Sequence, residues 1–333
     1  MPPARTLSPR TTARLMPAAP LSANGKPPRA ASGCALVSDK QLGDVTLLEP
    51  AARLLATRSG KPCALHVNAA FRPLIDLMPH AVWGPESGTA AESWTTSWST
   101  RAAWMSLRAS ARKRCLLVNQ ERHLRAWFRL VYHERQVLPI RREYWAHYFW
   151  RALGGAEAEF SPPGLRQPPE DWRHPGLPEA PFILINPTAA WPSKFWSPES
   201  WARLPGSGLG GGMPWVMTGG GSPQEREHCA RIAALAPAGL VDLSGRTSLR
   251  EYLHALSRAR LVVCVDGSAS HLAQAFGNPV LTLFGPVYPP KWHWPTPRHR
   301  ALSAFDFSQE KLPPASAIPM ETVLDELHAH FGL

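Results

Sequence analysis

The chain is predicted to fold as an α/β protein with two domains, each built on a parallel sheet. Apolar, β-branched runs alternate with helical patterns in both halves of the sequence, which is typical of parallel α/β structure. The alternation is clearest in residues 261–284, where the runs LVVCV and PVLTLF enclose a helical segment. With 333 residues, the chain is long enough for two cores of ordinary size.

The first predicted domain spans residues 32–160. Its expected strands lie at 35–38, 62–68 and 115–119, and its expected helices at 45–57, 71–78 and over most of 121–153. Residues 85–100 are rich in Ser, Thr and Trp, and we predict a loop there. This half therefore shows the alternation of a Rossmann-like domain.

A linker and a second domain follow. Residues 161–181 are crowded with Pro, Gly and charge, which indicates an interdomain linker. The second domain is expected at 182–318, with strands at 182–186, 215–217, 261–265 and 279–284, and helices from 198, at 223–236, from 249 and from 271. Ser248 and Glu251 have capping-box spacing at the start of the third of these helices.

The two ends of the chain have distinct compositions. Residues 1–31 are basic and rich in Pro and Ala, without periodicity, and we expect a disordered extension. They lack the apolar core of a secretory signal. Residues 319–333 form an amphipathic pattern that predicts a C-terminal helix.

The cysteines and the hydropathy limit the class of protein. The five cysteines are scattered without C-x-x-C spacing, which favours reduced core cysteines in a cytoplasmic protein over a zinc site. No apolar run approaches the ~18 residues of a membrane span.

The net charge of +11 predicts an anionic partner or surface. Arginines and aromatic residues are interleaved between positions 101 and 151. A solvated helical face over an aromatic core is the simplest interpretation. Nucleic acid is not favoured, because no nucleic-acid-binding motif accompanies the charge. An anionic glycolipid, with peripheral contact at the inner membrane surface, fits arginine and aromatic side chains equally well.

Residues 266–270 form a small polar loop between a buried strand and a helix. At the carboxyl end of a parallel strand, such a loop presents N–H groups and a helix N-terminus to an anion. The sequence therefore predicts a phosphate-binding site at this loop.

Residues 242–286 resemble glycosyltransferase family 9, the heptosyltransferase family of lipopolysaccharide assembly. The shared pattern comprises D-x-x-G-x-T-S-L at 242–249, an apolar strand that ends in Asp at 266, H-L-A at 271–273 and P-V-x-x-L-F-G-P at 279–286. One departure is that residues 266–268 read Asp-Gly-Ser where the family usually has Asp-Thr-Gly. The resemblance covers about residues 34–330 and is stronger in the second half.

The resemblance implies a GT-B architecture, in which two Rossmann-like domains face a central cleft. The first domain would hold the acceptor and the second the nucleotide-sugar donor. The family's chemistry is inverting and metal-independent, and no D-x-D pair of the metal-dependent transferases occurs in the chain. We therefore expect no metal and no cofactor beyond the nucleotide sugar, with ADP-heptose as the family's best-known donor.

Two residues are candidates for catalysis. Asp44 ends the segment Q-L-G-D, and in the family the Asp of L-G-D is the proposed general base. The alternatives are that Asp44 only caps a helix, or that Asp39 is the base. Lys194 lies in a K-F-W-S-P segment similar to the family's Lys-x-Trp-Pro motif, whose lysine meets the donor diphosphate. A solvated loop lysine is the alternative.

The expected donor-binding residues follow the strands of the second domain or begin its helices. They are Thr188, Gly219, Gly220, Thr247, Ser248, Asp266, Gly267, Ser268, Ser270 and His271. Four have simpler alternatives. The glycines would only make a turn, Asp266 would only cap a helix, and His271 would be a buried core histidine.

Together these features predict an inverting glycosyltransferase that transfers a sugar, with heptose expected, to a lipopolysaccharide core or a related glycan. Two alternatives stay open. One is another GT-B nucleotide-sugar enzyme such as an epimerase. The other is a non-catalytic relative that binds glycan during assembly. The expected location is the cytoplasm, at the inner face of the membrane.

Overall fold

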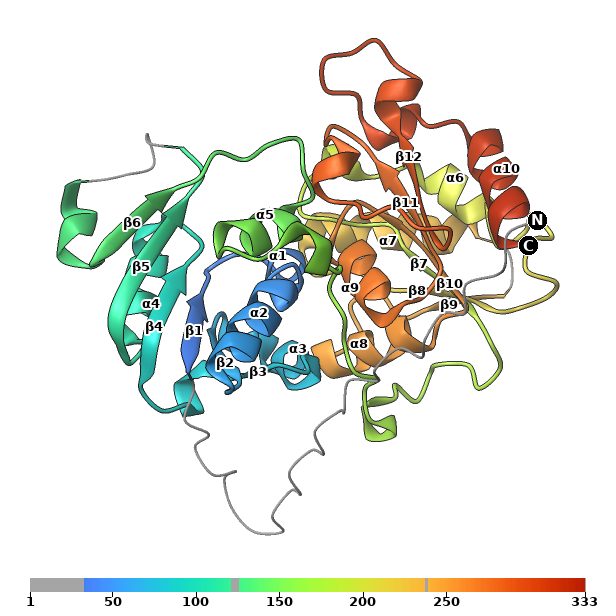
Figure 1. The fold of residues 1–333 in the computed structure, drawn as a ribbon. Coiled ribbons are helices and arrows are strands. Elements are labelled where there is room, and N and C mark those ends of the chain that lie inside the picture. The colour runs from blue at the N-terminus through green and yellow to red at the C-terminus, as the bar shows by residue number, and fades with distance from the viewer. Residues whose placement is uncertain (1–32, 121–125, 237–238, 333) are drawn as a thin grey trace, which may run out of the picture.

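The computed structural model describes residues 33–120, 126–236 and 239–332. It shows two lobes joined side by side, each a six-stranded parallel sheet with helices packed on it (Figure 1). The predicted disorder of residues 1–31 lies outside the described residues. No helix among the described residues is long and apolar enough to cross a membrane.

The first sheet has the strand order β3-β2-β1-β4-β5-β6. Its strands are β1 (Cys34–Val37), β2 (Cys63–His66), β3 (Ala81–Trp83), β4 (Ala90–Thr95), β5 (Ala111–Val118) and β6 (Glu134–Val137). The order reverses between β1 and β4, which is the switch point of a doubly wound sheet.

The second sheet repeats this topology, with the order β12-β11-β10-β7-β8-β9. Its strands are β7 (Ile183–Asn186), β8 (Trp215–Met217), β9 (Leu240–Asp242), β10 (Leu261–Val265), β11 (Val280–Phe284) and β12 (His299–Ser303). Here the order reverses between β7 and β10. The α/β class and the two Rossmann-like sheets of the predicted architecture are thereby confirmed.

Five α-helices accompany each sheet among the described residues. In the first half these are α1 (Leu42–Thr46), α2 (Glu49–Ser59), α3 (Arg72–Leu77), α4 (Thr100–Arg108) and α5 (Trp145–Ala152). In the second half they are α6 (Pro198–Arg203), α7 (Pro223–Leu235), α8 (Leu249–Arg258), α9 (Ser268–Phe276) and α10 (Met320–Phe331). The predicted C-terminal helix, α10, buries Val323 and Leu327 against the second sheet.

Three predictions for the first half are wrong. Residues 85–100 are not a loop, because they contain β4, a central strand paired with both β1 and β5. Residues 121–153 are not mostly helical: the described part holds a 3-10 turn (Ala126–Leu130), the edge strand β6 and the short helix α5. The helix predicted at 45–57 is two helices, because the chain breaks at residues 47–48 before Pro50 starts the next helix.

The second half contains all the strands and helices predicted for it, and two edge strands, β9 and β12, that were not predicted. The capping box of α8 is present, with the Glu251 N–H 3.3 Å from Ser248 Oγ and the Ser248 N–H 2.7 Å from Glu251 Oε2. One boundary differs, since α9 begins at Ser268 rather than at His271. The first turn of α9 therefore follows the end of β10 with only two residues between them.

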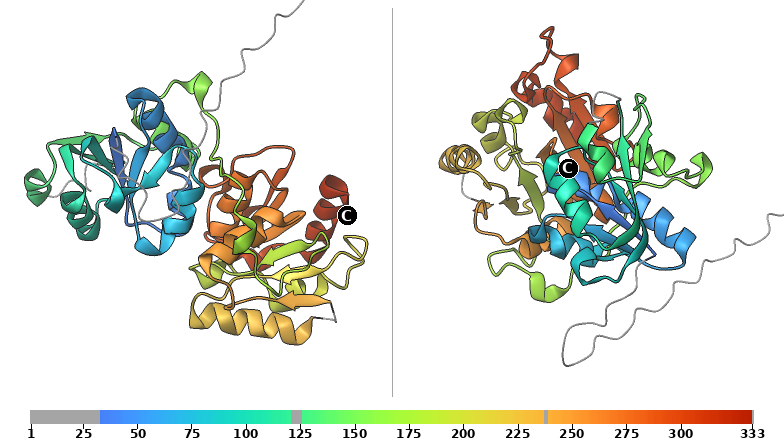
Figure 2. Two further views of the ribbon diagram at one scale, coloured as in Figure 1. Left: turned by 90° about the horizontal axis from the view of Figure 1, so that it is seen from below. Right: turned by 90° about the vertical axis from the view of Figure 1, so that its left-hand side faces the viewer.

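The two lobes meet most closely where α1 lies against α9. A Cβ atom at Gly43 of α1 would lie 2.8 Å from His271 Cδ2 and 3.3 Å from the backbone of Ser268. Because both distances are shorter than ordinary contacts, only glycine allows this approach. The segment between the lobes touches both of them, with the Leu165 N–H bonded to the Ala275 carbonyl and the Arg166 N–H to the Leu77 carbonyl (Figure 2).

Candidate active site

A cavity of about 840 Å³ lies between the lobes and opens on the carboxyl ends of both sheets. Its size falls within the usual range for small-molecule sites. It is lined from the first lobe by residues that follow β1 and β4, and from the second lobe by residues that follow β7 and β10. Both topological switch points therefore face one cavity, which is where doubly wound sheets bind ligands.

The first wall carries two carboxylates with different surroundings. Asp39, just after β1, accepts hydrogen bonds from the hydroxyls of Ser97 and Ser99, which follow β4. Asp44 lies in the first turn of α1 and is half-buried. The N-cap of α1 is Gln41, and the Asp44 carboxylate accepts a hydrogen bond from the Gln41 N–H, so Asp44 also satisfies a backbone donor at the helix start.

The pKa of the Asp44 carboxyl is raised, which makes the carboxylate a stronger base. Burial raises the pKa of the Asp44 carboxyl above its ordinary value, although the charge of Lys40, the Gln41 N–H and the charge of Lys194 lower it in part. A carboxylate of raised pKa in a cleft is a better base than an exposed one. In its ionised form this carboxylate can take a proton from a hydroxyl.

The second wall is built around an ion pair. Lys194 Nζ lies 2.6 Å from Asp266 Oδ2, which joins the loop after β7 to the end of β10. The Asp266 side chain is nearly fully buried. The ammonium also lies 4.9 Å from the ring centre of Trp191, which is exposed in the cleft. An ammonium has three donors, so Lys194 can keep this pair and still meet an anion in the cavity.

The N-terminus of α9 faces the cavity with its backbone donors uncapped. Its N-cap is Gly267, which has no side chain to satisfy the first N–H groups of the helix. These groups and the helix dipole form an anion site. The alternative that Asp266 only caps this helix is wrong, because Gly267 occupies that position.

His271 contributes a neutral donor or acceptor beside this helix end. Burial lowers the pKa of its imidazole to about 4. Its ring is 4 % exposed, and Nδ1 has no hydrogen-bond partner among the described residues. His271 is therefore both the buried histidine of the simpler interpretation and a cavity-lining group with an unused ring nitrogen.

A third side of the cavity comes from the loops after β8 and before α8. Gly219, Thr247 and Ser248 of these loops line the cavity, together with Thr188 after β7; the sequence predicts all four as donor-binding residues. Gly219 has φ +123°, and a Cβ there would lie 2.6 Å from Thr188 Oγ1. Glycine is therefore required at this position both by conformation and by the close approach of Thr188.

Two predicted donor-binding residues do not line the cavity. Gly220 lies against the backbone of Gly245, and a Cβ atom at Gly220 would be 3.1 Å from the Gly245 backbone nitrogen. Ser270 is fully buried and shares a 2.8 Å hydrogen bond with Thr282 on β11. The Ser270 hydroxyl belongs to the interior of the second domain, because its position on α9 turns it toward the sheet.

Several cavity-lining residues were not found from the sequence. On the first wall these are Lys40 and the segment 97–99, and on the second wall Asn186, Tyr252 and Trp292. The segment 97–99 was missed because β4 was taken for a loop. The signal that could have found it is the run TTSWST directly after Trp94, a cluster of hydroxyls at a strand end.

The Gly267–Ser268 departure leaves the loop open to a side chain at 267. Gly267 has an extended backbone with φ −170°, and a Cβ there would lie 3.4 Å from the Ala189 Cβ, an ordinary contact. Ser268 and the half-buried Tyr252 of α8 both line the cavity, and Asn186 Nδ2 donates to the Tyr252 hydroxyl at 3.4 Å. Burial raises the pKa of that phenol.

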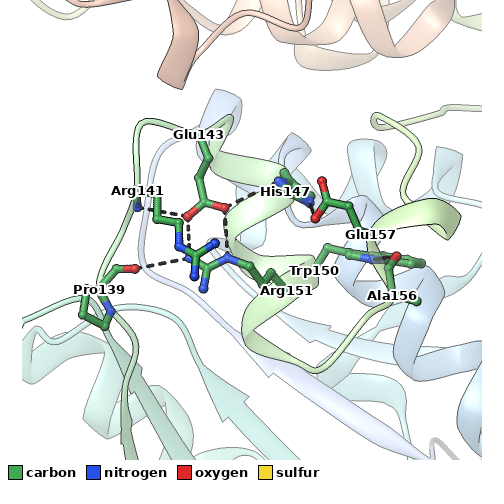
Figure 3. A network of polar contacts seen from close by, with 8 residues as sticks. All are labelled: Pro139, Arg141, Glu143, His147, Trp150, Arg151, Ala156 and Glu157. Atoms are coloured by element: carbon green, nitrogen blue, oxygen red, sulfur yellow. Dashed lines mark hydrogen bonds and ion pairs between the residues drawn. The ribbon is translucent and has the colours of Figure 1, made fainter.

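A network of polar contacts holds the segment before α5 (Figure 3). Glu143 accepts hydrogen bonds from the Arg151 guanidinium and from the Arg141 N–H, and Arg151 also donates to the Pro139 carbonyl. His147 Nδ1 lies 3.5 Å from Glu143. Burial alone would raise the pKa of the Glu143 carboxyl, but these donors and the Arg151 charge hold it below its ordinary value.

This network supports an aromatic contact between the lobes. Tyr144 and Trp145 follow Glu143 directly, and their rings lie 5.6 Å from Trp294 and 6.1 Å from Trp292 respectively. Trp292 lies in turn 6.1 Å from the His271 ring. The first lobe therefore packs against the residues that enclose the buried imidazole of the second.

Within the part of the chain that the structure describes, no group of three or more His, Cys, Asp or Glu side chains is arranged to hold a metal ion. The charged groups of the cavity are carboxylates and lysines distributed over both walls.

Comparison with known proteins identifies the family. The sequence profile described as "Glycosyltransferase family 9 (heptosyltransferase)" matches residues 95–313, which is more than half of the chain. The chain belongs to glycosyltransferase family 9. The matched range contains Lys194, Asp266 and His271 and therefore the whole second wall of the cavity.

Curated family members match over a limited stretch. Lipopolysaccharide heptosyltransferase 1 of Pseudomonas aeruginosa is 35% identical over 117 residues, which is 34% of this chain and 31% of that protein. The enzyme of the same name from Escherichia coli K12 is 34% identical over 100 residues, 29% of each chain. The match thus spans about a third of the length of these curated relatives.

Solved structures share the fold over nearly the whole chain. A family 9 glycosyltransferase of Veillonella parvula superposes with a TM-score of 0.73 at 18% identity, covering 89% of this chain and 96% of that one. The Escherichia coli ADP-heptose lipopolysaccharide heptosyltransferase II gives a TM-score of 0.70 at 19% identity, covering 89% and 97%. The two-lobed architecture is therefore that of family 9 structures.

Proposed function

We propose that the protein is an inverting glycosyltransferase that moves a sugar, with heptose expected, from a nucleotide diphosphate to a lipopolysaccharide core or related acceptor. The observation that carries this proposal is the opposition of the two walls. Asp44 on α1, a carboxylate of raised pKa, and an anion site formed by Lys194 and the start of α9 line the same cavity from opposite lobes. Sugar transfer needs both a base for the acceptor hydroxyl and a site for the leaving anion.

The proposed step follows from these positions. An acceptor hydroxyl attacks the anomeric carbon of the donor sugar, its proton passes to the Asp44 carboxylate, and the bond from carbon to the diphosphate oxygen breaks. The leaving diphosphate carries the negative charge away, where Lys194, the uncapped N–H groups of α9 and an N–H of His271 stabilise it. Because attack and departure occur on opposite faces of the carbon, the configuration inverts.

The substrates of related proteins support the choice of donor and acceptor. One Escherichia coli structure of the same fold contains ADP-2-deoxy-2-fluoro heptose, and the curated relatives are lipopolysaccharide heptosyltransferases. We propose an ADP-sugar as donor, bound without a metal ion on the second domain. We propose an anionic glycolipid as acceptor, bound by the first domain at the cytoplasmic face of the inner membrane.

A binding experiment tests the donor site first. ADP, UDP, GDP and CDP are titrated calorimetrically into the protein with and without magnesium, and with Lys194→Met as the variant. We expect one nucleotide, ADP, to bind equally well with and without magnesium, and Lys194→Met to weaken that binding. Absence of binding by all four nucleotides would contradict the proposal and favour a non-catalytic relative.

A transfer assay then tests the whole reaction. ADP-heptose is incubated with deacylated lipopolysaccharide core as a water-soluble acceptor, and the anomeric configuration of the product is read by NMR. We expect a product whose configuration is opposite to that of the donor. Retention of configuration would overturn the inverting mechanism.

A further inference from the structure

The outer end of the first domain carries a group of large apolar side chains in contact with solvent. Trp104 is 63% exposed and Leu107 44% exposed on α4, and Leu130 is 86% exposed in the 3-10 turn Ala126–Leu130. The two segments pack inward on one core cluster, through Ala103 of α4 and Phe128 of the turn. Their outer sides therefore lie on the same face of the first sheet, on the lobe's side away from the second domain (Figure 1).

We call this area the α4 surface and define it by six residues. They are Trp104, Leu107, Arg108, Trp127, Arg129 and Leu130. On α4, Trp104 and Arg108 are one helical turn apart and Leu107 lies beside them, so the outer side of the helix mixes apolar and cationic groups. Trp127, Arg129 and Leu130 repeat the mixture on the turn, and all three are exposed.

The charge of the α4 surface is positive. Neither α4 nor the 3-10 turn contains an acidic residue. Glu92 on β4 and Glu134 on β6 both pair with Lys113. On β5, Lys113 points to the opposite sheet face from Leu116 and Val118, which pack in the cluster under α4. Among the described residues, these acids therefore do not pair with Arg108 or Arg129 of the α4 surface.

The α4 surface is connected to the cavity by α4 itself. Ser99 is the N-cap of α4, lines the cavity and donates to Asp39. From there the nine residues of α4 run outward, a length of about 13 Å. A surface in contact with the outer side of α4 is thus roughly one short helix away from the catalytic wall.

We propose that the α4 surface docks the protein on an anionic phospholipid bilayer. Tryptophan is favoured at the membrane–water interface, where its ring is half in water and half in apolar surroundings. Leucine side chains enter the acyl boundary, and each arginine near an anionic leaflet strengthens binding about fivefold. A nucleic acid would engage the arginines and tryptophans but would leave Leu107 and Leu130 in water, so the bilayer fits the whole set better.

The proposal rests on the proposed function only for the purpose of docking, which would bring the protein to a glycolipid acceptor held in such a bilayer. Docking needs neither donor nor acceptor. With the bilayer under α4, an acceptor sugar that projects from the leaflet would reach the margin of the cavity at Ser99.

Vesicle flotation with matched variants tests the proposal. The protein is mixed with vesicles of phosphatidylcholine alone, or of phosphatidylcholine with phosphatidylglycerol, containing no acceptor. The test variant is Arg129→Ala with Leu130→Ala. Its control on α7 is Arg231→Ala with Leu235→Ala, which removes the same two exposed side chains from the second domain.

We expect the protein to float with the phosphatidylglycerol vesicles only. The test variant should bind them about tenfold more weakly, and the control should bind like the unmodified protein. Trp104→Ala should weaken binding in the same direction. Circular dichroism and Tm establish that each variant is folded; all the substituted side chains are exposed.

Two results would overturn the proposal: no flotation of the unmodified protein, or equal loss of binding in the test and control variants. Tighter binding to a DNA duplex than to the vesicles, weakened by the test variant, would also overturn it and assign the surface to nucleic acid. Transfer to the water-soluble acceptor is measured in parallel. If the unmodified protein binds the vesicles but transfers no sugar, only the proposed function is contradicted. If it transfers sugar but does not bind the vesicles, only the docking role of the α4 surface is contradicted.

Discussion

The two sheets have the same topology, but different side-chain pairs join the strand ends at their switch points. In the first domain, the carboxylate of Asp39 after β1 is held by the neutral hydroxyls of Ser97 and Ser99 after β4. In the second domain, Lys194 after β7 is held by the carboxylate of Asp266 after β10. One crevice thus keeps a net negative charge, and the other contains a balanced ion pair beside a helix N-terminus.

This difference suits the two walls to different chemistry. The first wall carries two carboxylates and one lysine, Lys40, and Asp44 on that wall has a raised pKa, which suits it to accept a proton from a hydroxyl. A lysine fixed by a buried aspartate, together with uncapped N–H groups, is suited to hold an anion without reorganisation. Variants on each wall test whether proton transfer and anion binding are divided in this way.

The largest expected effect comes from the first wall. Asp44→Asn should lower the turnover of sugar transfer about 1000-fold, because the acceptor hydroxyl loses its base. Nucleotide affinity, measured by calorimetry, should stay unchanged, because the donor site lies on the other wall. The control is Asp39→Asn, which removes the charge of the neighbouring carboxylate and keeps a polar side chain of the same size. If Asp39→Asn abolishes turnover and Asp44→Asn does not, the base is Asp39.

The second wall should show a combined effect on turnover and stability. Lys194→Met should reduce turnover about 100-fold, because the leaving group loses its cation. It should also lower the free energy of unfolding by about 3 kcal/mol, because Asp266 is left buried without a partner.

The double variant Lys194→Met with Asp266→Asn separates these two effects. It removes the unpaired charge, so the unfolding free energy should recover while turnover stays low. Denaturant unfolding and steady-state kinetics provide the two readouts. Recovery of turnover in the double variant would show that Lys194 acts only as the partner of Asp266.

The spacing between the walls should matter less than their chemistry. Gly43→Ala should lower turnover about tenfold, because a methyl group between α1 and α9 meets His271 and Ser268 and separates Asp44 from the anion site. Gly164→Ala is the matched control, since a Cβ there has no heavy atom within 4 Å. Equal turnover of the two variants would mean that the α1–α9 contact does not set the geometry.

The smallest expected effect is a pH-dependent change in stability. Because burial raises the folded-state pKa of Asp44, its contribution to stability is present below the unfolded pKa and is lost as the pH rises through the folded pKa. Asp44→Asn should therefore raise Tm at pH 7 and should not raise it at pH 3.

Glu143 provides the opposite sign for this comparison. Its folded-state pKa is lowered, so its contribution is present above the unfolded pKa of about 4.5 and is lost as the pH falls through the folded pKa. Glu143→Gln should therefore lower Tm at pH 7, with a difference that shrinks at acid pH. Thermal unfolding of both variants from pH 3 to pH 8 gives the readout, and shifts of the same sign would contradict the assignments.

The second domain could be predicted from its sequence because its strands are buried on both faces. The runs in β7, β10 and β11 are continuously apolar, and every residue of these strands is buried. The capping box of α8 and the small loop before α9 mark where the helices start. Motifs alone therefore pointed to Lys194, Asp266 and the α9 loop, which line the cavity in the structure.

The first domain was harder to predict because its central strand is polar. β4 has the sequence AAESWT, in which Ser93 and Thr95 are buried only because β1 and β5 lie on either side. No local period distinguishes such a segment from a loop. Because β4 was predicted as a loop, the sequence analysis did not locate the switch point of this domain. It therefore did not assign Ser97, Trp98 and Ser99 to the site.

By itself, the sequence determined the α/β class, the family resemblance and the identity of the groups that can bind or ionise in the second wall. These properties depend on neighbours in the chain: apolar runs, caps and glycine loops. Only the tertiary structure decided that both switch points open on one cavity, that Ser270 turns into the core and that Lys194 pairs with Asp266. Those outcomes depend on contacts between segments far apart in sequence, and the raised pKa of Asp44 depends on them too, because burial is produced by packing one lobe against the other.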